Sequence, residues 1–152
     1  MEKVFIDSNV FIIHLRYQRD KNFEVNKKFL ELVINGKIQG FTSIYNLLEI
    51  TGILSFNLNE KQIKEFFVSF PKIFNVSIIF PENSTEETAC IDIEDTFSLI
   101  LKKMSFLDAV ILDVFGKSKI KTFITWNAKD FKEKTNKKVL TPEEFLKSLN
   151  KF

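Results

Sequence analysis

Short apolar runs alternate along the chain with longer stretches in which apolar residues recur at helical spacing. Val4-Phe5-Ile6 has the character of a buried parallel strand, and it ends at Asp7. Similar strands are predicted at residues 76–80, 121–125 and 138–140, with a short one at Phe41-Thr42. Strands that alternate with helices favour an α/β fold with a mainly parallel sheet. We therefore expect polar residues at the carboxyl ends of the strands to form any ligand site.

The stretches between the strands predict seven helices from their apolar spacing, caps and stop signals. We expect them at residues 10–15, 22–34, 42 or 43 to 54, 58–70, 84 to about 104, 105–115 and from 142 onward. Pro71 is expected to end the fourth. Ser84-Thr85-Glu86-Glu87 resembles a capping box that opens the fifth, which would carry one apolar face made of Ile93, Phe97, Ile100, Leu101 and Met104.

Composition narrows the class of protein. The 152 residues contain no repeat, linker or low-complexity tract, so we predict one domain over residues 1–152. The 18 phenylalanines indicate an aromatic-rich core and exposed rings available for self-association, so we expect a homodimer. The single cysteine, Cys90, fits a reducing compartment, and no apolar stretch approaches the ~20 residues that span a bilayer. We expect a cytoplasmic protein that does not enter the membrane.

Three acidic residues lie in apolar surroundings far apart in the sequence. Asp7 leaves a strand, Glu49 lies in an apolar helix, and Asp108 follows Ser105 by three residues. Each also has a purely structural interpretation: Asp7 as a helix cap, Glu49 as a solvated edge, Asp108 as part of a capping box. Asn127 and Asp130 follow the strand at 121–125, where either could cap a short helical turn.

The chemistry favours one site for these groups. Mg²⁺ and Mn²⁺ prefer carboxylate, amide and water oxygens, and such ions activate water for phosphodiester hydrolysis. Carboxylates gathered without a cation would be pushed toward protonation. His14 and Cys90 are too few for a zinc site of the Cys/His type. We expect His14 on the face of an early helix and Cys90 packed inside the long helix.

The sequence resembles the PIN-domain family, including the VapC-type toxins of prokaryotic toxin–antitoxin pairs. The matching segments span nearly the whole chain in the family's order: Val4-Phe5-Ile6-Asp7-Ser8-Asn9-Val10, Tyr45-Asn46-Leu47-Leu48-Glu49, Phe106-Leu107-Asp108-Ala109-Val110, Ile124-Thr125-Trp126-Asn127-Ala128-Lys129-Asp130-Phe131, and Val139-Leu140-Thr141-Pro142-Glu143-Glu144-Phe145-Leu146.

The resemblance implies a PIN-like three-layer α/β/α fold and an endoribonuclease that uses Mg²⁺ or Mn²⁺. It implies that Asp7, Glu49 and Asp108 are catalytic and bind the metal. The family's Thr-x-Asp pattern is here Thr125-Trp126-Asn127, so an amide replaces a carboxylate. Either Asn127 is a ligand, or Asp130 compensates as a catalytic carboxylate. Around Asp7, the resemblance implies orienting groups at Ser8, Asn9 and Thr125.

Two other functions remain open at this stage. A PIN domain that binds RNA or protein with weak or no catalysis is compatible with Asn127. A receiver-like or nucleotide-binding module is disfavoured, because no glycine-rich phosphate loop exists and the strand at 76–80 ends in Pro81-Glu82 without an aspartate. The resemblance also implies an antitoxin protein as partner besides the RNA substrate. Lysines flank the site segments and could contact phosphates, namely Lys117, Lys119, Lys121, Lys129, Lys132, Lys134, Lys137 and Lys138.

Overall fold

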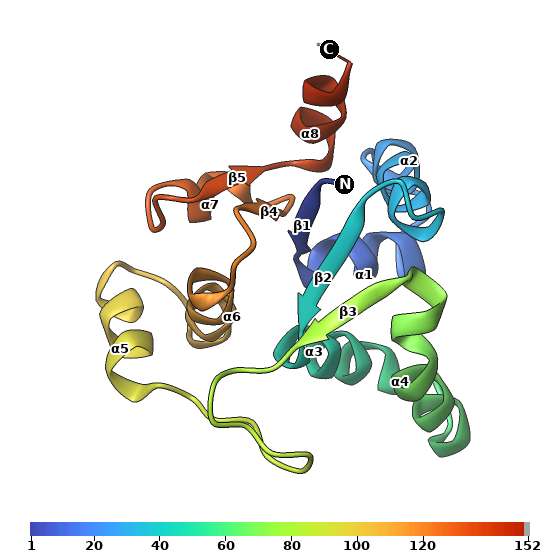
Figure 1. The fold of residues 1–152 in the computed structure, drawn as a ribbon. Helices are drawn as coiled ribbons and strands as arrows, with labels where there is room; N and C mark the ends of the chain where they lie inside the picture. The colour runs from blue at the N-terminus through green and yellow to red at the C-terminus, as the bar shows by residue number, and fades with distance from the viewer. Residues whose placement is uncertain (151–152) are drawn as a thin grey trace.

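A five-stranded parallel sheet forms the centre of the computed structural model, which describes residues 1–150 (Figure 1). The strands are β1 (Lys3–Ile6), β2 (Gln39–Ser43), β3 (Val76–Ile79), β4 (Thr122–Ile124) and β5 (Lys138–Leu140). Their order across the sheet is β3-β2-β1-β4-β5. The chain therefore adds β2 and β3 on one side of β1, and then adds β4 and β5 on the other side. The strand order reverses between β1 and β4, and we call the carboxyl ends of these two strands the crevice, because open α/β sheets bind ligands at such a reversal.

Eight helices accompany the five strands in the described part of the chain. They are α1 (Ser8–Arg16), α2 (Phe23–Ile34), α3 (Ile44–Ser55), α4 (Glu60–Phe74), α5 (Ile93–Leu101), α6 (Phe106–Lys117), α7 (Ala128–Lys132) and α8 (Pro142–Leu149). Side chains alternate across β1, so Val4 and Ile6 enter one core and Phe5 enters the other. The expected three-layer α/β/α architecture is confirmed.

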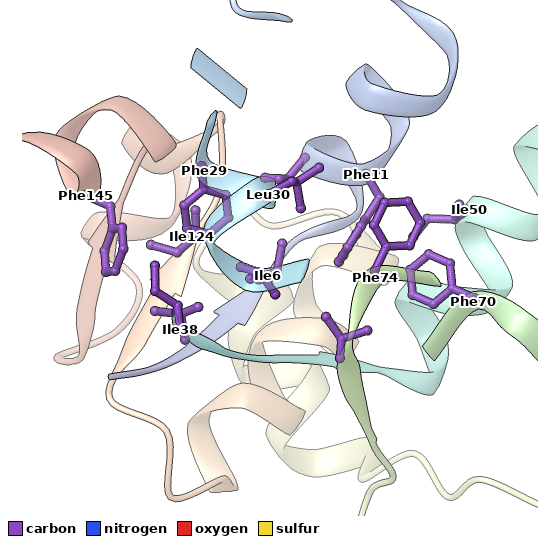
Figure 2. Packing of buried hydrophobic residues seen from close by; sticks show 14 of the residues in the cluster. Ile6, Phe11, Phe29, Leu30, Ile38, Ile50, Phe70, Phe74, Ile124 and Phe145 are labelled. Carbon is purple, nitrogen blue, oxygen red and sulfur yellow. The ribbon is translucent and has the colours of Figure 1, made fainter. Parts of the chain in front are cut away.

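Phenylalanine rings fill both cores. On the first face, the ring of Phe11 from α1 lies 5.0 Å from the rings of both Phe70 and Phe74 of α4 (Figure 2). On the opposite face, Phe123 lies 5.3 Å from Phe5 at a steep angle. Aromatic pairs at these separations add stabilisation beyond the area they bury. Nine of the twelve largest fully buried side chains are phenylalanines, as the composition indicated.

Gly40 lets α2 approach the sheet closely. A Cβ atom at this position would lie 2.6 Å from a methyl carbon of Val33 and 2.8 Å from one of Val76. Both neighbours are themselves buried in the first core and have little room to move. A side chain larger than hydrogen would push α2 away from β2.

The prediction that Pro71 ends a helix is wrong, because α4 continues to Phe74 with Pro71 inside it. Asn75 ends the helix instead, in the left-handed conformation with φ 52°. The additional turn buries Phe74 against Phe70 and Phe11, and this packing offsets the backbone hydrogen bond that proline cannot donate.

The predicted capping box at Ser84 is also wrong. Residues 84–92 form no regular helix, and α5 begins only at Ile93, with Asp92 as its N-cap. Cys90 therefore lies exposed outside the helix, where its thiol donates to the carbonyl of Asn83. Most of the apolar face predicted for this helix is exposed rather than buried, since α5 packs mainly against α6 at the edge of the molecule (Figure 1). Only Met104, which lies beyond the end of α5, is buried in the second core.

The remaining helices agree with their sequence signals. Ser43 caps α3, and Thr141 and Glu144 form a reciprocal capping box at α8. His14 lies on α1, stacked on Phe23, as expected of an early helix face. No helix within residues 1–150 has the length and apolar character needed to cross a membrane.

Candidate metal and catalytic site

Asp7 lies at the crevice formed by the reversal in strand order. It directly follows β1, and its backbone N–H donates to the carbonyl of Ile124, so the β1–β4 ladder continues into the site. This register brings Thr125, which directly follows β4, beside Asp7. The Asp7 side chain is almost fully buried, and Oδ1 accepts from the N–H of Ser8 at 2.8 Å. Asp7 is thus the N-cap of α1, and its other carboxylate oxygen, Oδ2, takes no part in the cap.

The Thr125 hydroxyl is a fixed hydrogen-bond donor to Asp7. Its oxygen accepts from Nδ2 of Asn9 and from the backbone N–H of Asn127, both at 3.1 Å. These two bonds occupy its acceptor positions, so the hydroxyl proton is directed to Oδ2 of Asp7 at 2.7 Å. Because Thr125 is fully buried, this arrangement orients the carboxylate without competition from solvent.

Asn46 of α3 holds the opposite side of Asp7. Its Nδ2 donates to Oδ1 of Asp7 at 3.3 Å and to the hydroxyl oxygen of Ser8 at 2.8 Å. The same side chain forms the capping box of α3 through its Oδ1, which accepts from the hydroxyl and the N–H of Ser43. One buried amide therefore couples the start of α3 to the carboxylate of Asp7.

Three carboxylates influence one another electrostatically in this crevice. Burial raises the pKa of Asp7 to about 7, against the lowering effect of the Thr125 and Ser8 hydrogen bonds, and the charges of Glu49 and Asp108 raise it further. Burial and Asp108 also raise the pKa of Glu49, while a hydrogen bond from Ser8 lowers it. No lysine, arginine or histidine of residues 1–150 forms an ion pair with any of the three.

The structure distinguishes Asn127 from Asp130. The backbone N–H of Asn127 donates to the Thr125 hydroxyl, which brings the backbone of Asn127 close to Asp7, while its side chain is exposed. Asp130 is exposed on α7, and only its backbone is bonded: its N–H donates to the carbonyl of Asn127, and its own carbonyl accepts from Lys134. Asp130 is absent from the charges that shift the pKa of Asp7 or Glu49.

The donor set fits a hard divalent cation in its chemistry. It offers carboxylate and amide oxygens, and a buried carboxylate of raised pKa is stabilised by a cation. The arrangement is open, since no three His, Cys, Asp or Glu side chains of the described chain are already grouped to hold a metal ion. A shared ion would therefore require the flexible Glu49 or Asp108 side chain to turn toward Asp7.

A separate cavity of about 270 Å³ lies among α3, α5, α6 and the segment after β3. Tyr45, Asp113 and Lys117 line it, and none of the predicted catalytic residues does. Lys117 bridges the carboxylates of Asp92, Asp95 and Asp113 at 2.8–3.2 Å. One lysine thus pairs with all three acidic side chains, away from the predicted catalytic residues.

Comparisons with known proteins were made for family models, sequences and folds. No protein-family model and no curated protein sequence matches the chain. A chain in the structure of VapBC2 from Rickettsia felis, bound to a promoter DNA fragment, superimposes with a TM-score of 0.61, at 19% identity over 91% of this chain and 98% of that one. The chain has the VapC-type PIN-domain fold. A chain in the structure of VapBC-1 from nontypeable Haemophilus influenzae superimposes on this PIN fold with a TM-score of 0.60, at 16% identity over 93% of this chain and 98% of that one.

VapC20 from Mycobacterium tuberculosis, described as a sarcin-ricin loop cleaving toxin, is a more distant match to this PIN fold. Its TM-score is 0.51, at 13% identity over 79% of this chain and 86% of that one. Identities this low show a common fold and leave the chemistry of this chain to be argued from its own residues.

Sequence reasoning did not identify Asn46 as a site-related group. The Ser43-x-x-Asn46 spacing is a helix-capping signal, and the bond from Asn46 to Asp7 spans 39 residues. Asn46 reaches Asp7 through a contact between segments distant in sequence, which a single sequence does not reveal.

Proposed function

We propose that the chain is an endoribonuclease dependent on Mg²⁺ or Mn²⁺, with Asp7, Glu49 and Asp108 as its carboxylates. The observation that carries the proposal is the state of Asp7. It is a buried carboxylate without an ion pair within the described residues. Burial raises its pKa to about 7, and the charges of Glu49 and Asp108 add to that rise. A group in this position costs stability unless a cation or proton joins it. A divalent cation at the crevice would remove that cost.

Each side chain of the candidate site would have a distinct role. Ser8, Asn46 and Thr125 fix the plane of the Asp7 carboxylate and leave an acceptor position on Oδ2 for a cation. Glu49 and Asp108 would complete the ligand set, and the amide oxygen of Asn127 would supply the position that a carboxylate holds in the resembled family. A metal bound there would supply an activated water and charge relief on the phosphate.

RNA is the proposed substrate. The matched VapC20 is described as cleaving the sarcin-ricin loop, which supports RNA as the class of polymer without fixing the sequence. Among the lysines near the site, Lys129 is exposed on α7 between Asn127 and Asp130, where it could contact phosphate. Several others have structural partners instead: Lys132 pairs with Glu144, and Lys137 donates to three carbonyl groups.

Cleavage of labelled RNA tests the proposal. We expect the purified protein to cut single-stranded or stem–loop RNA in Mn²⁺ or Mg²⁺ and to stop in a chelator. Asp7→Asn should lower the rate by more than the roughly 10- to 100-fold that loss of an outer-shell group costs. The Lys61→Ala variant, on the exposed surface of α4, should retain activity. Cleavage that persists in the chelator or in Asp7→Asn would contradict the proposal.

A second candidate is a PIN domain that binds RNA or protein with little catalysis. The neutral amide at Asn127 and the open arrangement of the acidic groups favour it. Binding of RNA by the wild-type protein without cleavage in any divalent metal would support this alternative.

We also propose an antitoxin partner and a homodimer. The matched VapBC structures contain two components, which supports a protein partner for this chain. Self-association is supported by the exposed face of α5, where Ile93, Phe97 and Leu101 are 82%, 57% and 65% exposed. This α5 face, completed by Ile100, is apolar over the length of the helix, which is unusual for a surface in water.

A further inference from the structure

One buried pair of side chains ties the β4–α7 turn to the helices on the first face of the sheet. Asn26 of α2 is fully buried, and its Oδ1 accepts from the indole N–H of Trp126 at 2.8 Å. Its Nδ2 donates to the backbone carbonyl of Val10 in α1, also at 2.8 Å. A single amide thus joins three segments that are far apart in the sequence.

The orientation of the Asn26 amide is fixed by its partners. An indole N–H can only donate, and a backbone carbonyl can only accept. Turning the amide over would set donor against donor and acceptor against acceptor. Because Asn26 is inaccessible to solvent, neither lost bond would be replaced cheaply by water.

Trp126 lies between the two turn residues that reach the candidate site. Its own backbone N–H donates to Oδ1 of Asn9 at 3.2 Å. The preceding residue, Thr125, donates to Asp7, and the following residue, Asn127, donates its N–H to Thr125. Displacement of Trp126 would therefore move both the donor that orients Asp7 and the proposed amide ligand.

We propose that Asn26 is a positioning residue for the metal site, acting through the Trp126 indole. It touches neither metal nor substrate, and its effect on metal binding rests on the proposed function. An apolar residue at position 26 could fill the same space, and a ring without N–H could pack in the place of Trp126. The hydrogen bond between Asn26 and Trp126 forms in one arrangement only. It therefore fixes the position of the β4–α7 turn, whereas an apolar pair would only fill space in the core.

Amide hydrogen exchange and Mn²⁺ calorimetry on four variants test this role. Asn26→Leu and Trp126→Phe each remove one partner, and the double variant removes both. Asn22→Ala is the matched control at the N-cap position just before the same helix, because the Asn22 side chain makes no capping bond. In either single variant, we expect exchange at the Trp126 and Asn127 amides to accelerate at least tenfold in metal-free protein. The Phe145 amide of α8 serves as the internal reference.

The double variant separates positioning from packing. Removing both partners leaves neither an unpaired indole N–H nor an unpaired amide oxygen, and only the bond to the Val10 carbonyl stays lost, so the melting temperature should recover part of the way toward wild type. Positioning predicts that exchange at the turn stays fast and that the Mn²⁺ dissociation constant stays roughly 10-fold raised, as for other outer-shell losses. Metal affinity that recovers together with the melting temperature would overturn the proposal, as would unchanged exchange in the single variants.

The measurements also separate this inference from the proposed function. If wild-type protein neither binds Mn²⁺ nor cleaves RNA, the proposed function fails, while exchange in metal-free protein still decides whether Asn26 holds the turn. If Asn26→Leu does not fold, Trp126→Phe keeps the aromatic ring and provides the same test. The wild-type titration can be followed by fluorescence as well, because Trp126 is the only tryptophan.

Discussion

At the scale of single residues, the candidate site depends on how the buried carboxylate of Asp7 is stabilised. Asp7 is both the N-cap of α1 and the centre of a hydrogen-bond network that includes Thr125 and Asn46. The structural and the functional interpretations of Asp7 are therefore compatible. Oδ1 accepts the cap bond and the bond from Asn46, and Oδ2 accepts from Thr125, which leaves Oδ2 with an electron pair for a cation.

The pKa of Asp7 predicts an unusual dependence of stability on pH. Its folded pKa of about 7 lies above the unfolded value near 4, so the folded state binds the proton more tightly. The associated stability is complete below about pH 4 and is lost as the pH rises to about 7, at about 1.4 kcal/mol for each unit of pKa shift. In a chelator at pH 8, Asp7→Asn should thus be more stable than wild type in urea unfolding.

Adding Mn²⁺ is the control for this prediction. An ion that binds only the folded state should restore wild-type stability at pH 8 and leave Asp7→Asn nearly unchanged. Equal stability of the two proteins from pH 4 to 8 in chelator would show that the Asp7 carboxylate is not disfavoured by burial.

The identity of the fourth ligand gives a second prediction at this scale. Both side chains are exposed, but the backbone of Asn127 donates to Thr125, whereas that of Asp130 makes no bond to the residues around Asp7. Asn127→Ala should therefore weaken Mn²⁺ binding, and Asn127→Asp should strengthen it because a carboxylate replaces an amide. Asp130→Asn should have little effect. Calorimetric titration of the three variants decides, and a severe loss in Asp130→Asn alone would reverse the assignment.

At the scale of secondary-structure elements, Asp108 shows how a helix start can serve a site. Ser105 caps α6 by accepting the N–H of Asp108 at 3.4 Å. The Asp108 side chain does not accept a hydrogen bond from the backbone N–H of Ser105. In the reciprocal capping boxes of α3, α4 and α8, the corresponding side chain does accept this bond. The cap therefore requires Ser105, and the carboxylate of Asp108 remains available to Asp7 and Glu49.

This division predicts opposite effects for two neighbouring substitutions. Ser105→Ala should lower the free energy of unfolding by about 1 kcal/mol with catalysis largely retained. Asp108→Asn should leave stability unchanged or raised, because repulsion among the carboxylates falls, and should abolish cleavage. Melting temperature and cleavage rate measured on the same preparations test both. Loss of stability with full activity in Asp108→Asn would make Asp108 a structural residue only.

Local signals in the sequence predicted most of the helices and strands. They failed where tertiary packing overrides the local signal. The Thr141-Pro142 start of α8 and the Ser43 cap of α3 depend on neighbouring residues, so they could be predicted. Pro71 was misjudged because the last turn of α4 is held by Phe74 in the core. Ser84 was misjudged because a capping pattern does not ensure that a helix follows it.

At the scale of the whole molecule, the strand order positions the candidate site. Asp7 and Thr125 are 118 residues apart, yet the pairing of Ile6 with Ile124 makes them neighbours. The sequence located both as polar residues after strands, and the family resemblance supplied their common site. Strand order itself is a non-local property, so periodicity alone could not have placed β1 beside β4.

The exposed α5 face leads to the last prediction, which concerns self-association. A two-fold axis across this face would pair α5 with its copy in antiparallel fashion. Glu94 in the first turn of one α5 would then approach Lys102 just after the end of the other. This complementarity, together with the exposed Phe97 and Leu101, favours an isologous dimer.

Phe97→Asp should convert such a dimer to monomer, because two like charges would face each other in a desolvated contact. Phe56→Asp is the matched control, since Phe56 is 89% exposed at the end of α3, away from this face. Light scattering at micromolar concentration should give twice the chain mass for wild type and for Phe56→Asp, and the single mass for Phe97→Asp. A monomeric wild-type protein would contradict the dimer. A dimer that survives Phe97→Asp would place the contact on another surface, and the α5 face would then need a different occupant.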